Sequence, residues 1–187
     1  MKKKILSYVL FVSLLSVPTL TYAHTVTETG SESDGYIIGT HAPTKQPKFW
    51  WTPGTDQYWK DRLNAGNNSM YSQTSNNLKV VNGTAFETNN YIEALGKQFD
   101  TWVARVVTQQ SSGQHKDSWH LQFNTKYEDD YTDSQWNGIA QHELGHVFGL
   151  RDLYDSSNSA KLMYGYAGSY SGLKTTDLTG LKKIWGF

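Results

Sequence analysis

The sequence has 187 residues, no cysteine, and 17 basic against 17 acidic residues, a length typical of one globular domain. Residues 1–23 have the pattern of a secretory signal peptide: three lysines precede an apolar segment, and Ala23 ends a typical cleavage site. The apolar segment is shorter than the roughly 20 residues that a membrane span needs. Without residues 1–23 the chain carries 14 basic and 17 acidic residues, which gives no electrostatic basis for binding nucleic acid or anionic lipid. We therefore expect a secreted protein with no membrane attachment after signal cleavage.

The segment that follows is polar. Residues 24–46 are rich in Thr, Ser, Gly and Glu and have almost no apolar periodicity, which favours a flexible leader or a short pro-segment. Within it, residues 36–38 are the only apolar cluster and could form a short strand. We expect the folded domain over residues 47–187, beginning with a strand at residues 49–51, because Pro53 and a glycine follow directly.

The next elements alternate between helix and strand patterns. A helix is expected over residues 56–73, where large apolar residues lie near one face. Residues 66–68, Gly-Asn-Asn, favour a loop inside this segment equally well. Short strands are expected over residues 78–81 and 101–108, and a short helix-like segment over residues 91–96.

The second half of the chain has clearer signals. Residues 119–123 alternate with a period of two and predict a half-exposed strand. Thr132 and Gln135 have the spacing of a capping box, which predicts that a helix begins there. That helix is expected to end at Gly149, and residues 175–177 can cap a last helix.

Two histidines lie in the second half of the helix expected after Thr132. His142 and His146 are four residues apart, so their side chains share one face of a helix. Two imidazoles placed in this way can bind one zinc ion, and the neighbouring carboxylate of Glu143 can reach a water on that ion. The pattern predicts a zinc peptidase site in which Glu143 is the general base.

A zinc site of this kind needs a third protein ligand. No glutamate follows Glu143 and no histidine follows the pair, so the remaining downstream carboxylates are Asp152, Asp155 and Asp177. Asp152 is preferred because it follows directly after the turn expected at Gly149. Asp155 is the second choice, and Asp177 has the position of a helix cap.

Residues 142–152, H-E-L-G-H-V-F-G-L-R-D, resemble the extended motif of the metzincin metallopeptidases, and the aspartate form resembles the small secreted bacterial snapalysin type. Residues 162–166 resemble the Met-turn of these enzymes, and residues 173–186 resemble the terminal helix of matrixin catalytic domains. The resemblance covers residues 119–186. It implies an α+β, zincin-like fold with a small, twisted, mostly parallel sheet, an active-site helix, a Met-turn and a C-terminal helix.

The resemblance also implies roles. His142, His146 and Asp152 would bind one catalytic zinc, Glu143 would be the base, and Met163 would form an apolar floor beneath the imidazoles. Most matrixins have histidine where this sequence has Asp152. The sequence therefore departs from the matrixin pattern at its expected third ligand. The structural zinc and calcium loops and the cysteine switch of matrixins have no counterpart in this sequence.

The substrate in this family is an extended peptide that pairs with the edge strand of the sheet. That edge is expected within residues 101–110 or 119–125. Tyr164 and Tyr166 are expected to line the substrate pocket rather than to donate a hydrogen bond to the oxyanion. The acidic residues within 128–133 could bind calcium, but their spacing fits no known loop, which favours a solvated turn.

Two other functions fit the same pattern. The chain could be a secreted binding or inhibitory protein that kept a metzincin scaffold without turnover, although the intact Glu143 argues against this. It could also be a zinc amidase that acts on bonds outside proteins. The expectation that the sequence favours is a secreted, monomeric zinc endopeptidase that acts on protein or peptide substrates.

Overall fold

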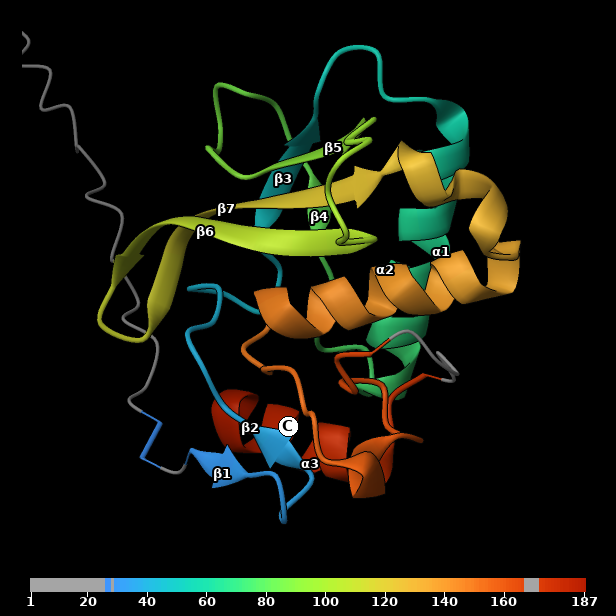
Figure 1. Cartoon of the computed structure of the whole chain (residues 1–187). Helices are drawn as coiled ribbons and strands as arrows, with labels where there is room; N and C mark the ends of the chain where they lie inside the picture. Colours follow the sequence, from blue (N-terminus) through green and yellow to red (C-terminus); the bar gives the residue numbers. More distant parts are fainter. Residues whose placement is uncertain (1–25, 28, 167–171) are drawn as a thin grey trace, which may run out of the picture.

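A five-stranded sheet forms the upper layer of the molecule in Figure 1, with strand order β4-β3-β5-β7-β6. The computed structural model describes residues 26–27, 29–166 and 172–187, so the expected signal peptide lies outside the described residues. β3, β4, β5 and β7 are all parallel to one another, and the edge strand β6 pairs antiparallel with β7. The strands are β3 (Lys48–Trp51), β4 (Val81–Asn82), β5 (Tyr91–Leu95), β6 (Ala104–Ser112) and β7 (His115–Asn124).

Two helices pack against each other beside this sheet. α1 (Gln57–Gln73) and α2 (Asp133–Val147) contact each other, and α2 also contacts β6 and β7. A second small sheet, β1 (Gly30–Ser31) with β2 (Tyr36–Ile37), lies beside the terminal helix α3 (Thr175–Trp185) at the opposite end of the molecule. Short 3-10 turns, η1 (Thr125–Asp130) and η2 (Ser156–Asn158), complete the fold. This mixed α/β arrangement with a mostly parallel sheet confirms the fold class expected from the sequence.

The segment expected to be helix-like at residues 91–96 is a strand, and that prediction was wrong. β5 lies between β3 and β7 and forms backbone hydrogen bonds with both. Short apolar segments fit either period, and pairing on both sides decides the outcome here. The strand expected at 101–108 starts and ends later, as β6, and its pairing with β7 is irregular between Thr108 and Gln110.

α1 is a single continuous helix, although its Gly66 favoured a loop in the sequence. Gly66 is buried where α1 crosses α2. A Cβ atom at this position would lie 2.8 Å from the Asn137 carbonyl oxygen and 2.8 Å from the Gln141 backbone nitrogen. The glycine that weakens the local helix pattern therefore permits the close crossing of the two helices.

α2 begins as the sequence predicts. Thr132 is its N-cap, its hydroxyl oxygen accepts a hydrogen bond from the Gln135 backbone nitrogen, and the Gln135 side chain accepts one from the Thr132 backbone nitrogen at 2.9 Å. The start of the helix is anchored by Trp136, which is fully buried with its ring 4.7 Å from that of Trp59. This support fixes the helix that carries the two histidines.

The polar segment before β3 is folded onto this core. Tyr36–Ile37 forms β2, as expected, and Ile38, His41 and Ala42 are buried. Its backbone runs from α3 to the end of α2, where the Ala42 nitrogen donates to the Val147 carbonyl oxygen. Removal of this segment as a pro-segment stays a prediction. Within the part of the chain that the structure describes, no helix has the length and apolar character needed to cross a bilayer.

Candidate functional site

His142 and His146 project from the last two turns of α2, and their ring centroids are 4.8 Å apart. Each ring is oriented by a backbone carbonyl: His142 Nδ1 lies 2.7 Å from the Leu162 oxygen, and His146 Nδ1 lies 2.9 Å from the Leu150 oxygen. A carbonyl oxygen only accepts, so Nδ1 must carry the hydrogen in both rings. In the neutral form this leaves each Nε2 as the atom able to bind a metal.

Asp152 faces both of these nitrogens. Its Oδ1 is 3.1 Å from His142 Nε2 and 3.4 Å from His146 Nε2. The turn that brings it there passes through Gly149, whose φ is +107°. A Cβ atom on Gly149 would lie 2.8 Å from the His41 Cβ, so both backbone conformation and space select glycine.

The two other candidate aspartates lie elsewhere. Asp155 is exposed and accepts a hydrogen bond from the Ser157 nitrogen at the start of η2. Asp177 is buried in the first turn of α3, and its Oδ2 accepts hydrogen bonds from the Lys174 and Leu162 nitrogens. The structure therefore brings only Asp152 of these three carboxylates to the histidine pair.

Glu143 is the second carboxylate at the site. It is 4% exposed, and its Oε2 has no hydrogen-bond partner among the described residues. One ligand atom from each of His142, Glu143 and His146 lies within 4.8 Å of the others. Glu143 and Asp152 thus both place a carboxylate beside the two imidazoles, and Asp152 Oδ1 directly faces both Nε2 atoms. Burial raises the pKa of the Glu143 carboxyl group above its ordinary value.

The electrostatics of the cluster favour a cation between the rings and Asp152. Burial alone would lower the pKa of His142, but the nearby carboxylates of Asp152 and Glu143 raise it to about 9. Burial alone would raise the pKa of Asp152, but the two imidazoles beside it hold it well below its usual range. Two imidazole nitrogens and one carboxylate form a donor set that suits a catalytic zinc with an open position.

Met163 packs directly beneath α2. It is 1% exposed, and a Cβ atom on Gly145 would collide with its sulfur. The turn that carries Met163 pairs with the segment after Asp152, because the Leu153 nitrogen donates to the Met163 carbonyl oxygen at 2.8 Å. Met163, Gly145 and the segment that carries Asp152 are thus held in one packed unit.

A cleft of about 840 Å³ opens beside these residues and is lined by β6 on one side and by Tyr164 and Tyr166 on the other. The two tyrosine rings are 5.4 Å apart, and Tyr166 is 56% exposed. Two regions were expected at the edge of the sheet. Residues 101–110 overlap β6, which is an edge strand, whereas residues 119–125 overlap β7, which is internal.

Three residues at the site have no signal in the sequence. The Tyr154 hydroxyl donates to Asp152 Oδ2 at 3.4 Å. Lys116 is buried, donates to the His146 carbonyl oxygen, and has its pKa lowered to about 8 by burial. Glu32 also lines the cleft. Lys116 and Glu32 are distant from the His-Glu-Leu-Gly-His motif in the sequence, and Tyr154 follows it without any motif spacing, so only the fold brings the three residues to the site.

No protein-family model matches the chain, and no curated protein sequence matches it. Its structure is similar to that of high choriolytic enzyme 1 (HCE-1), a hatching enzyme zinc-protease from Oryzias latipes (medaka fish). The TM-score is 0.50 at 13% sequence identity, and the match covers 87% of this chain and 99% of the other. The chain therefore has a mixed α/β fold similar to that of this hatching enzyme, and its paired histidines and Asp152 line one cleft.

Proposed function

We propose that this protein is a secreted zinc endopeptidase of the metzincin type, with His142, His146 and Asp152 as zinc ligands and Glu143 as general base. One observation carries the proposal: both Nε2 atoms and Asp152 Oδ1 converge, at 3.1 and 3.4 Å, beside a buried carboxylate in an open cleft. Secretion is part of the proposal and rests on the pattern of residues 1–23. The aspartate ligand and the terminal helix extend it to a matrixin-like enzyme with a snapalysin-type motif.

The chemistry follows from the chain's own groups. When bound, zinc supplies a Lewis acid that acidifies water and polarises the scissile carbonyl group. Glu143 accepts the proton of the attacking water and then passes it to the leaving amine nitrogen. The raised pKa of Glu143, caused by burial, suits a group that must both accept and release this proton near neutral pH. The carbonyl oxygens of Leu150 and Leu162 keep the two imidazoles in the tautomer that can bind the metal.

The substrate would be a peptide that binds in an extended conformation along β6. β6 is at the edge of the sheet, and its residues Ala104, Arg105, Val106 and Thr108 line the cleft. Backbone groups of an edge strand can form hydrogen bonds with an added strand. Tyr164 and Tyr166 would contact substrate side chains at the other wall, which suits apolar residues. We expect the enzyme to act as a monomer.

The substitution Glu143→Gln tests the general base. It keeps the shape of the side chain but removes its ability to take a proton, so casein hydrolysis should fall by about 10²–10⁴-fold. Zinc content, measured by atomic absorption, should stay near one ion per chain. Glu128→Gln, in the exposed η1 turn, removes one charge away from the cleft and should leave both quantities unchanged.

The wild-type protein itself separates the alternatives. If it binds zinc but cleaves no member of a peptide library, the endopeptidase proposal fails and the non-catalytic binding protein on the same scaffold is supported. Cleavage of non-peptide amides alone would instead identify a zinc amidase. Equal hydrolysis by the wild type and the Glu143→Gln variant would show that Glu143 is not the base.

A further inference from the structure

The segment that carries Asp152 is held by backbone pairing on both sides. On one side it pairs with residues 37–39, and on the other it pairs with residues 163–165. Side chains alone therefore do not place this aspartate. The donors and acceptors are Gly39 N to Gly149 O (2.8 Å), Arg151 N to Ile37 O (2.9 Å), Leu153 N to Met163 O (2.8 Å) and Gly165 N to Leu153 O (2.9 Å).

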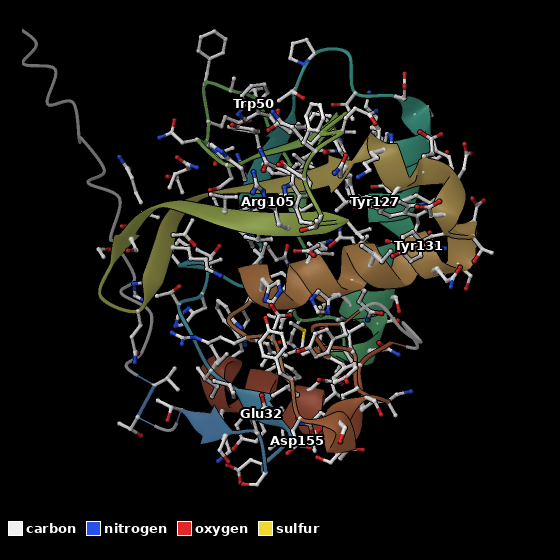
Figure 2. All side chains as sticks on the ribbon, in the orientation of Figure 1. Glu32, Trp50, Arg105, Tyr127, Tyr131 and Asp155 are labelled. Atoms are coloured by element: carbon white, nitrogen blue, oxygen red, sulfur yellow. The ribbon has the colours of Figure 1, made fainter. Side chains whose placement is uncertain are left out.

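Glu32, in the turn between β1 and β2, clamps the residues that follow Asp152. Its Oε1 accepts a hydrogen bond from the Tyr154 nitrogen at 2.8 Å, and its Oε2 accepts from the Asp155 nitrogen at 3.2 Å. The buried Asn158 amide donates to the same Oε2 at 2.6 Å. Figure 2 shows Glu32 and Asp155 next to each other below α2, at the end of the molecule that holds β1 and β2.

This clamp reaches the candidate metal site through one residue. Tyr154 has its backbone held by Glu32 and its hydroxyl group 3.4 Å from Asp152 Oδ2. Hydrogen bonds from backbone amides to an ionised carboxylate are among the stronger hydrogen bonds in proteins. Both oxygens of Glu32 are used in this way on consecutive residues, so the carboxylate fixes the direction in which the chain leaves Asp152.

We propose that Glu32 is a positioning residue for the third metal ligand, and that residues 30–42 remain part of the mature protein. This rests on the proposed function for the identity of the metal. Loss of these residues at a processing site near residue 46 would remove the clamp, the backbone pairing made by residues 37–39, and the buried core residues Ile38 and Ala42. The segment would therefore be a support of the metal site, and its removal would impair the site.

The test measures metal affinity in Glu32→Ala, in Glu32→Gln and in a control, Asp34→Ala. Asp34 lies in the same turn, carries the same charge and accepts a hydrogen bond from Ser31 within that turn. Zinc dissociation constants are measured by competition with a chromophoric chelator, and the visible spectrum of the cobalt-substituted protein reports ligand geometry. Loss of a group that orients a ligand typically weakens metal binding by about 10–100-fold.

We expect Glu32→Ala to raise the zinc dissociation constant within that range and to change the cobalt spectrum. Glu32→Gln should fall between the wild type and Glu32→Ala, because one amide oxygen still accepts a hydrogen bond. Asp34→Ala should match the wild type. If Glu32→Ala does not fold, Glu32→Gln decides by the same two measurements. A folded variant with unchanged zinc affinity and an unchanged cobalt spectrum overturns the positioning role.

The N-terminus of the secreted, active protein tests the second half of the proposal. Intact mass and N-terminal sequencing should give a chain that contains Glu32. An active chain that begins after residue 46 would overturn retention of the segment. Absence of peptide cleavage by the wild type would refute the proposed function, yet the affinity and spectral comparisons would still decide the role of Glu32.

Discussion

The pH dependence of zinc affinity follows from the proton that His142 carries beside the carboxylates of Asp152 and Glu143. In the metal-free protein the pKa of His142 is raised to about 9, so below that pH the ring carries a proton that zinc must displace. Each pH unit below this value weakens apparent zinc binding about tenfold, which gives roughly a 100-fold weaker affinity at pH 7 than the limiting value. Zinc affinity therefore rises with pH until the His142 ring has lost its proton.

Asp152→Asn separates the two roles of the carboxylate. The variant loses the charge of Asp152, which raises the pKa of His142, while burial still lowers this pKa and Glu143 still raises it. Its affinity should therefore depend less steeply on pH than that of the wild type. At high pH the zinc affinity of Asp152→Asn should be more than about 100-fold weaker than that of the wild type. Loss of a group that only orients a ligand costs up to about 100-fold, and here a direct ligand is lost.

The assay is chelator competition at each half pH unit from 6.5 to 8.5, with the chelator's own protonation included. The wild type should give a slope near +1 for the logarithm of the association constant against pH, and Asp152→Asn a smaller slope. A flat wild-type profile would refute the raised pKa of His142. Equal limiting affinities for the two proteins would refute Asp152 as a ligand.

Two further predictions concern the scaffold. Gly145→Ala places a Cβ atom against the Met163 sulfur, so overpacking should lower the free energy of unfolding by about 1–3 kcal/mol, measured by urea denaturation of the metal-free protein; an unchanged midpoint would contradict the packing of this turn against α2. Thr132→Ala removes one half of the capping box and should cost about 1 kcal/mol in the same measurement. Its zinc affinity should equal that of the wild type, because the cap lies at the far end of α2, and a loss of affinity would contradict this separation.

Local patterns account for the elements that the sequence predicts well. The capping box of Thr132 and Gln135, the turn at Gly149 and the four-residue spacing of the histidines are all set within a few residues along the chain. Each of these signals can be recognised without knowledge of the fold, because the residues involved are close together in the sequence. The helix that carries the candidate site was therefore predictable.

Other features depend on partners that are distant in sequence. β5 is a strand because it pairs with β3 on one side and with β7 on the other. α1 continues through Gly66 because the glycine lets α2 pack closely against it. The contacts of Glu32 span more than 120 residues, and Lys116 reaches a carbonyl group 30 residues away. No period or spacing in a single sequence encodes such pairs, so the supporting groups of the site could not be predicted.

The irregular pairing in β6 has a consequence for self-association. An edge strand of nine residues would present a continuous row of unpaired backbone groups to another copy of the protein. The disturbance between Thr108 and Gln110 divides this row, and the outer half carries the exposed polar residues Gln109 to Ser112. Only the half that borders the cleft keeps regular geometry. The edge can thus stay open to a short peptide while resisting the extended strand-to-strand pairing that leads to aggregation.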